Sequence, residues 1–179
     1  MTRDPASPPP GDPAVALYRL YDRAVGDVYG YFVRRCESTA VAEDLTSETF
    51  MAAVEAVRHG RNPQPSTPWL IGIARHKLVD HWRRRARDEA ALTRVADVGA
   101  GVVDDWDVHI DGLRAQTVLA GLAPQHRLAL TLRYLDGLPV PEVAALIDRT
   151  LHATEALLVR ARAAFRRAYA ATGEEGPDA

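Results

Sequence analysis

The sequence of 179 residues contains a single cysteine, Cys36. One thiol cannot form an intramolecular disulfide or a cysteine-based metal cage, and we expect this thiol to be packed inside the fold. No segment approaches the roughly 18 consecutive apolar residues of a membrane span. The first residues also lack the apolar segment of a secretory signal peptide. Together these absences predict a cytoplasmic protein.

The chain also has little net charge and no catalytic pattern. It carries 22 Lys and Arg against 24 Asp and Glu, which gives a formal net charge of -2. A near-neutral chain is not drawn as a whole to nucleic acid or to an anionic membrane, so any such role must rest on a local patch. The sequence shows no nucleophile–base pair and no glycine loop that would cradle a phosphate. We therefore expect no enzymatic activity and no cofactor.

One such local patch lies between Pro68 and Arg87. The segment starts as an apolar helix, in which Trp69, Ile73 and Leu78 recur at helical spacing and predict an inward face. It ends in a cationic cluster formed by Arg83, Arg84, Arg85 and Arg87. Arg75 lies eight residues before the start of this cluster. Guanidinium groups displace counterions from nucleic acid and bond phosphates bidentately. The alternative is a solubilising helix end, where cations also favour the helix dipole.

The whole chain has helical periodicity and no convincing strand pattern, which predicts an all-α fold. We expect two small helical domains, an N-terminal helical bundle and a C-terminal helix-turn-helix domain, joined by a flexible acidic linker. The predicted helices cover residues 14–32, 39–57, 69–90, 113–121, 124–136, 140–147 and 151–171. The predicted divisions are a disordered tail at 1–13, domains at 14–90 and 113–171, a linker at 91–112, and a second tail at 172–179. The predicted buried stripes include Tyr21, Val54 and Leu151.

The last two predicted helices have the layout of a helix-turn-helix. A short helix at 140–147 is followed by a turn at 147–150 and a longer helix at 151–171. In this motif the N-terminal residues of the second helix enter the major groove of DNA. The pattern alone equally fits an ordinary helical hairpin of a bundle, and both interpretations stay open at this point.

Three segments together resemble the extracytoplasmic-function (group IV) sigma factors of bacterial RNA polymerase. The first is Ala42-Glu43-Asp44-Leu45-Thr46-Ser47-Glu48-Thr49-Phe50, which is similar to the core-polymerase-binding helix of that family. The second is the patch from Trp69 to Arg87, which is similar to the helix that binds the minus-ten promoter element. The third combines Leu122-Ala123-Pro124, Leu132-Arg133-Tyr134, Glu142-Val143-Ala144 and Arg160-Ala161-Arg162, which is similar to the minus-thirty-five domain.

The resemblance implies a set of binding residues and partners. The partners would be core RNA polymerase, through the clamp helices of its largest subunit and the flap of its second-largest subunit, then promoter DNA, and an anti-sigma factor. Polymerase binding would use Asp44, Leu45, Ser47, Glu48 and Phe50. The minus-ten element would be bound by Arg58, Arg61, Asn62, Arg75, His76, Lys77, Asp80, Trp82, Arg83, Arg84, Arg85 and Arg87. The minus-thirty-five element would be bound by Arg149, Thr150, His152, Thr154, Glu155 and Arg160.

This chain departs from the family pattern at several of these positions. His76 stands where the family often has Asn, close to the pocket for a flipped base, and Ser47 stands where Gln is usual. In the recognition helix, Glu155 and Leu157 replace two usual cations. A carboxylate near phosphates is unfavourable, but it can accept a hydrogen bond from the N4 amino group of cytosine. We therefore expect a minus-thirty-five sequence different from that of relatives with the basic form.

Two other function classes compete with this interpretation. One is a helix-turn-helix regulator that binds DNA by itself, which usually requires a dimer interface or a ligand domain. The other is a metal-dependent enzyme that uses His76, Asp80 and His81, although the neighbouring Lys77 and arginines would repel a cation. Two features also have interpretations without a binding role. The acidic face of the second predicted helix can be solvated surface, and the acidic linker can be a spacer between the domains.

Overall fold

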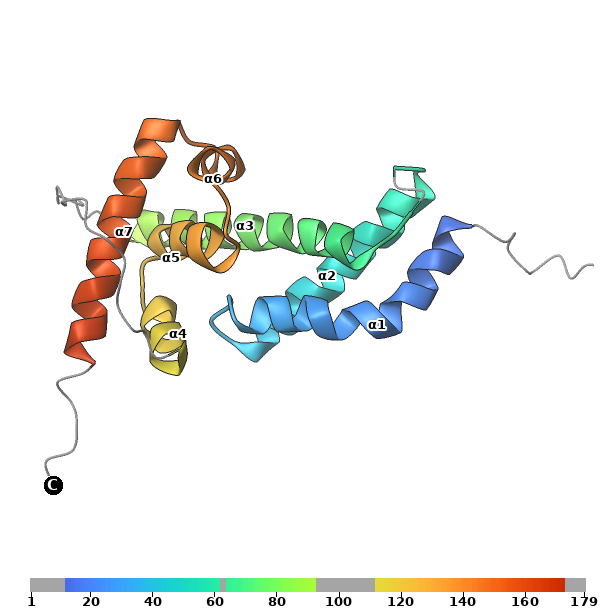
Figure 1. Ribbon diagram of the computed structural model, residues 1–179, viewed down its shortest axis with the longest axis horizontal. Helices are drawn as coiled ribbons and strands as arrows, with labels where there is room; N and C mark the ends of the chain where they lie inside the picture. Colours follow the sequence, from blue (N-terminus) through green and yellow to red (C-terminus); the bar gives the residue numbers. More distant parts are fainter. Residues whose placement is uncertain (1–11, 62–63, 93–111, 173–179) are drawn as a thin grey trace, which may run out of the picture. The chain divides into compact units, whose positions relative to one another are not determined.

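The computed structural model describes residues 12–61, 64–92 and 112–172, without the side chains of 90–92. The described residues form helices and contain no strand, which confirms the predicted all-α class (Figure 1). The chain divides into two compact units, residues 1–78 and 79–179. Most of the predicted linker, most of both predicted tails and Asn62 lie outside the described residues, whereas residues 91 and 92 belong to α3 and residue 112 belongs to α4.

The first unit contains α1 (Pro13–Val33), α2 (Thr39–Arg58) and the first half of α3 (Thr67–Leu92). The helix α1 begins where Asp12 accepts a hydrogen bond from the backbone N–H of Ala14 at 2.8 Å, with Pro13 at the first helical position. Both features favour a helix start. Residues 12 and 13, which the sequence assigned to an N-terminal tail, belong to this helix start.

The core of the first unit lies between packed helices. The helices α1 and α2 contact each other along their lengths. Ala24, Val28 and Phe32 of α1 have no exposed surface, and neither do Leu70 and Leu78 of α3. Because buried apolar area is the main source of stability, these residues hold the unit together. Cys36 is also buried, as expected for a packed thiol.

The second unit contains the rest of α3 together with α4 (Gly112–Ala120), α5 (Pro124–Leu130), η1 (Thr131–Leu135), α6 (Val140–Ile147) and α7 (Leu151–Ala171). Helix α7 contacts α4, α5 and α6. One core cluster in this unit consists of Val118, Leu119, Leu130, Ala161 and Phe165. Arg114 closes the end of this cluster, with its guanidinium 4.0 Å from the centre of the Tyr169 ring.

The predicted helix at 124–136 changes its geometry in its last turn. Thr131–Leu135 is a π-helix, and the backbone N–H of Asp136 donates to the carbonyl of Thr131 at 3.0 Å. The side chain of Arg133 donates to the carbonyl of Leu138 at 2.9 Å. Gly137 then adopts a φ of 69°, which is accessible to glycine without a steric cost. These bonds widen the last turn before α6.

The helices α6 and α7 form the predicted helix-turn-helix with the predicted bounds. Asp148 ends α6 in the left-handed conformation, with a φ of 56°. Thr150 begins α7, because its hydroxyl accepts a hydrogen bond from the backbone N–H of Ala153 at 3.2 Å. A tight turn with a capped second helix fixes the direction in which α7 leaves α6.

Three residues predicted to be buried are exposed. Tyr21, Val54 and Leu151 expose 46%, 41% and 47% of their surfaces. Each lies at helical spacing from a buried neighbour, but on the margin of the stripe rather than at its centre. The period identifies the apolar face of a helix, whereas the packed neighbours decide how wide the buried part of that face is.

Candidate nucleic-acid interface

The cationic end of α3 is built around a buried tryptophan. Trp82 exposes only 3% of its surface, and the guanidinium of Arg127 lies 4.5 Å from the centre of its ring. The buried indole anchors this part of α3, while Arg84, Arg85 and Arg87 are exposed to solvent. Trp82 therefore belongs to the core of the second unit and not to a DNA-stacking surface, contrary to the expectation from the family resemblance.

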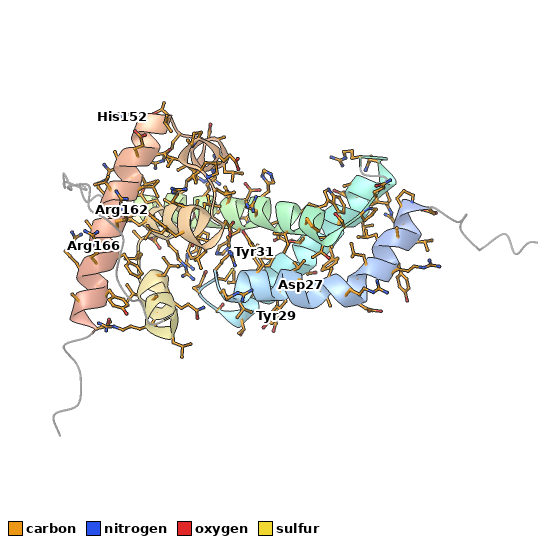
Figure 2. All side chains as sticks on the ribbon, viewed as in Figure 1. Asp27, Tyr29, Tyr31, His152, Arg162 and Arg166 are labelled. Atoms are coloured by element: carbon orange, nitrogen blue, oxygen red, sulfur yellow. The ribbon has the colours of Figure 1, made fainter. Side chains whose placement is uncertain are left out.

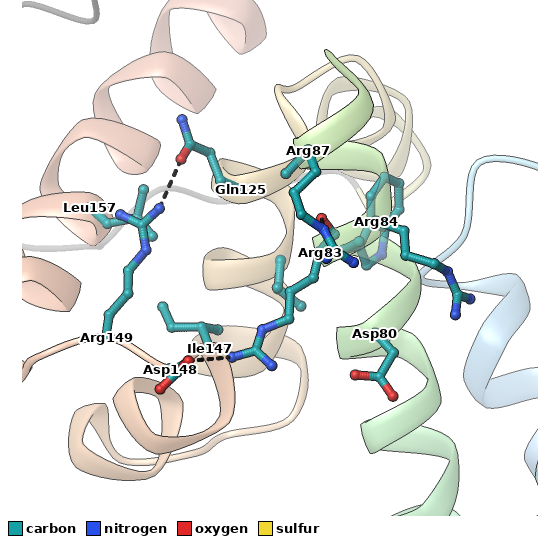
Figure 3. Close-up of a pocket in the computed structure, with 12 residues that line it drawn as sticks. Asp80, Arg83, Arg84, Arg87, Gln125, Ile147, Asp148, Arg149 and Leu157 are labelled. Carbon is teal, nitrogen blue, oxygen red and sulfur yellow. Dashed lines mark hydrogen bonds and ion pairs between the residues drawn. The ribbon is translucent and has the colours of Figure 1, made fainter. Parts of the chain in front are cut away.

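Polar residues from the helix-turn-helix lie beside the arginines of α3 (Figure 3). Arg83 pairs with Asp148 at 3.8 Å, and Arg149 donates to Gln125 at 3.2 Å. Together with Arg84 and Arg87 these groups surround a cavity of about 490 Å³. The carboxylate of Asp148 is 93% exposed, so its pairing with Arg83 is a surface ion pair of little energetic weight. The guanidinium groups therefore remain available to an external anion.

The other residues predicted for the minus-ten element lie in the first unit or at the start of the second. His76, Arg58 and Arg61 are exposed, Asp80 is exposed, and Arg75 is half-buried. The ammonium group of Lys77 lies 3.3 Å from the carboxylate of Glu48 on α2. This ion pair joins a residue predicted to bind DNA to one predicted to bind polymerase.

The exposed face of α7 carries a line of polar side chains. His152 and Glu155 are exposed, whereas Leu158, Ala161 and Phe165 are buried. Thr154 has no exposed surface, and its hydroxyl donates to the carbonyl of Thr150 at 3.0 Å. Thr154 is therefore a core residue rather than a DNA contact, because it faces the interior of the unit.

The same face of α7 continues through two arginines that the prediction from sequence left out. Arg162 and Arg166 follow Glu155 at seven and eleven residues, which keeps them on the same side of the helix as Glu155. Figure 2 labels His152, Arg162 and Arg166 along α7. Arg162 also donates to the hydroxyl of Tyr134 at 3.3 Å. The helical spacing from Glu155 is the signal in the sequence that identifies them.

Leu157 is almost fully buried and faces the core, so its replacement of a usual cation removes a charge without exposing an apolar group.

The residues predicted to bind polymerase lie on α2. Asp44 and Ser47 are exposed, whereas Glu48 and Phe50 are half-buried. Leu45 exposes only 2% of its surface. It packs inside the first unit, so the prediction that it contacts a partner is wrong for this structure.

Beside these residues, α1 and α2 border an apolar groove of about 1070 Å³. Tyr18 and Met51 on its sides expose 81% and 68% of their surfaces, and the rings of Tyr21 and Phe50 meet edge to face at 4.8 Å. Contiguous exposed apolar side chains of this kind mark an interaction surface. The sequence pattern did not identify this groove, because it assigned Tyr21 and Val54 to the core.

The described residues offer neither a metal site nor a membrane-crossing helix. Among them, no three or more His, Cys, Asp or Glu side chains are grouped so that they could hold a metal ion. His76, Asp80 and His81 thus do not form such a group. Within the same described ranges, no helix combines the length and the apolar character needed to cross a lipid bilayer.

Both halves of the chain match models of known protein families. The family model for sigma-70 region 2 matches residues 20–88, and the model for sigma-70 region 4 matches residues 113–165. The chain is 34% identical over 156 residues to the ECF RNA polymerase sigma factor BldN of Streptomyces coelicolor, an alignment that covers 83% of this chain and 58% of that protein. It is 32% identical over 138 residues to the ECF RNA polymerase sigma factor SigC of Mycobacterium tuberculosis. This alignment covers 75% of this chain and 73% of that protein.

A solved structure shares the fold. The chain matches the sigma factor RpoE of Bartonella quintana, solved in complex with the anti-sigma factor NepR, with a TM-score of 0.52 and 18% identity over 84% of this chain and 94% of that one. At this identity the likeness supports the helical fold alone. The sequence matches to both sigma-70 regions and to SigC show the family: the chain belongs to the extracytoplasmic-function sigma factors of the sigma-70 family.

Proposed function

We propose that this protein binds core RNA polymerase, recognises the minus-ten and minus-thirty-five promoter elements, and opens DNA for transcription initiation. One observation carries the proposal: a chain that matches sigma-70 regions 2 and 4 presents an exposed arginine cluster on α3 and an exposed polar face on the second helix of a helix-turn-helix. The first suits the DNA backbone and the second suits base edges. As a partner of polymerase the protein acts in the cytoplasm.

Polymerase binding is assigned to the outer face of α2. Asp44, Ser47 and Glu48 offer a polar, acidic surface, and Phe50 adds an aromatic edge. An acidic surface is complementary to a basic partner helix such as a clamp helix of the largest polymerase subunit. The neighbouring apolar groove, with Tyr18 and Met51 exposed, supplies the area that polar contacts alone do not. An anti-sigma factor that covers this surface would keep the protein from polymerase.

Recognition of the minus-ten element is assigned to α3 and the turn before it. Arg84, Arg85 and Arg87 bond the phosphates, and His76, with Arg58 and Arg61, lies where the family resemblance places the pocket for a flipped base. A histidine ring can stack on a base and donate or accept a hydrogen bond. The preference of this pocket is therefore set by His76 rather than by the Asn that is usual in the family.

Recognition of the minus-thirty-five element is assigned to α7 and the turn before it. His152 and Glu155 read base edges, while Arg149, Thr150 and Arg160 contact the backbone. The helix face that carries His152 continues to Arg166, about 21 Å further along the axis. Arg162 and Arg166 are therefore added as contacts to phosphates beyond the base-reading end. The flap of the second-largest polymerase subunit is the protein partner of this unit.

Run-off transcription with purified core polymerase tests the proposal. Genomic promoter fragments are transcribed with core polymerase alone, with the protein alone, and with both. The proposal expects discrete transcripts only when both are present, and co-elution of the protein with core polymerase in gel filtration. Failure to bind core polymerase would refute it. Specific DNA binding by the protein alone, without any effect of polymerase, would instead identify a stand-alone helix-turn-helix regulator.

A further inference from the structure

The cavity in the second unit has the size and charge of a small-molecule site (Figure 3). Its volume of about 490 Å³ lies within the roughly 300–1,000 Å³ of ligand pockets in proteins. Four arginines line it, Arg83, Arg84, Arg87 and Arg149, together with Asp80 and Asp148, and the guanidinium of Arg84 points away from the other three. The walls therefore carry an excess of positive charge.

The carboxylates neutralise this charge only weakly. Asp148 lies 3.8 Å from Arg83, and its side chain is 93% exposed, so solvent screens the pair. Arg149 is bonded to the neutral amide oxygen of Gln125. A phosphate oxygen offers these guanidinium groups a shorter, charge-assisted and bidentate bond. An anion with several phosphates can bind more than one of the four at the same time.

The cavity also has an aromatic and apolar side. The buried ring of Trp82 lines it. Leu128 and Ile147 add apolar surface to the same lining. A ligand with a planar, partly apolar ring and a phosphate chain matches both sides.

We propose that this cavity binds a nucleoside polyphosphate. The phosphate chain contacts the guanidinium groups of Arg83, Arg87 and Arg149, and the base lies against the apolar side. This inference depends on the geometry of the second unit and not on the proposed function. If the proposed function also holds, the ligand occupies arginines assigned to promoter DNA, so binding of the nucleotide and of the promoter are mutually exclusive.

Calorimetric titration of the full chain tests the site with GTP, ATP and sodium tripolyphosphate. One nucleotide is expected to bind per chain, about tenfold more tightly than tripolyphosphate, because the base adds apolar contact. Arg83→Ala/Arg149→Ala is expected to weaken nucleotide binding by about a hundredfold, since it removes two charge-assisted contacts. The matched control Arg19→Ala/Arg23→Ala removes the same charge from exposed positions of α1 and is expected to change nothing.

Equal losses in the two double variants would mean unspecific attraction of anions and would overturn the site. Equal affinity for GTP, ATP and tripolyphosphate would overturn the nucleoside part. Neither result involves polymerase or a promoter, so the failure of this inference is distinguishable from failure of the proposed function.

Discussion

The arginine end of α3 and the exposed face of α7 are both assigned to DNA, but they are built differently. The former repeats a single chemical group, at Arg83, Arg84, Arg85 and Arg87, around a buried tryptophan. The latter alternates a histidine, a carboxylate and arginines along one side of a helix. Repeated cations attract any DNA backbone, whereas distinct donors and acceptors distinguish bases. Affinity and sequence choice are thus assigned to different helices.

The largest expected effect comes from the residue that supports the arginines without touching DNA. Trp82→Ala removes a buried indole that is in contact with the guanidinium of Arg127, and we expect a loss of about 3–5 kcal/mol in the free energy of unfolding. Urea denaturation followed by circular dichroism measures it. Trp69→Ala, at a half-buried position of the same helix, is the control and should cost less. A stable Trp82→Ala protein that has lost only promoter binding would make Trp82 a DNA contact.

The second prediction tests the arginines themselves. Arg84→Ala/Arg87→Ala removes two exposed cations, and we expect promoter affinity of the holoenzyme to fall by about a hundredfold, or about 2.7 kcal/mol. The loss should be similar for all promoter sequences. The slope of log affinity against log salt should decrease in magnitude by about 2, because two phosphate contacts are lost. Filter binding at several salt concentrations measures both. A loss that depends on promoter sequence would contradict the division of roles.

The third prediction concerns the carboxylate on α7. Glu155→Gln keeps the size of the side chain but adds a donor, so we expect one position of the minus-thirty-five element to lose its preference for cytosine, by about 2 kcal/mol. Selection from a library randomised over that element measures the change. Arg166→Ala is the matched control, because it should weaken binding evenly across the library. An unchanged preference after Glu155→Gln would remove this residue from base recognition.

How far the sequence predicts the structure differs between these two regions. The bounds of α6 and α7 follow from local signals, since Gly137 and Pro139 separate helices and Thr150 can cap one. The role of Trp82 does not follow, because a tryptophan among cations suits both a core and a DNA surface. Its burial depends on Arg127, which lies 45 positions away in the sequence and next to it in space. Sequence patterns within one helix cannot predict a contact between residues so far apart in the chain.

Within one turn of α7, the sequence likewise predicts only part of the candidate site. The spacing of His152 and Glu155 places both on one face of α7, and the structure exposes both. Thr154 lies between them in the sequence and is predicted to bind DNA, but it faces the core, where its hydroxyl donates to the carbonyl of Thr150. A hydroxyl that is satisfied by its own backbone can be buried at little cost, which a scale of residue polarity does not show. The helix period was therefore a better guide to this face than residue type.

The smallest expected effect compares the N-terminal caps of the two helices that are assigned to DNA. Ser66 accepts a hydrogen bond from the N–H of Trp69 at 3.4 Å at the start of α3, and Thr150 accepts one from Ala153 at 3.2 Å at the start of α7. Either substitution by Ala should lower the free energy of unfolding by about 1 kcal/mol. The effects on DNA should differ, because Ser66 lies 17 residues, or about 25 Å, from Arg83, whereas Thr150 is two residues from His152. Thr150→Ala should therefore also weaken minus-thirty-five binding, and Ser66→Ala should leave phosphate binding by the arginines intact. Thermal melts measure the change in stability, and binding to promoter variants measures the change in DNA affinity. Equal losses of DNA affinity in the two variants would contradict this expectation, because they would mean that fraying at the start of a helix is transmitted along its full length.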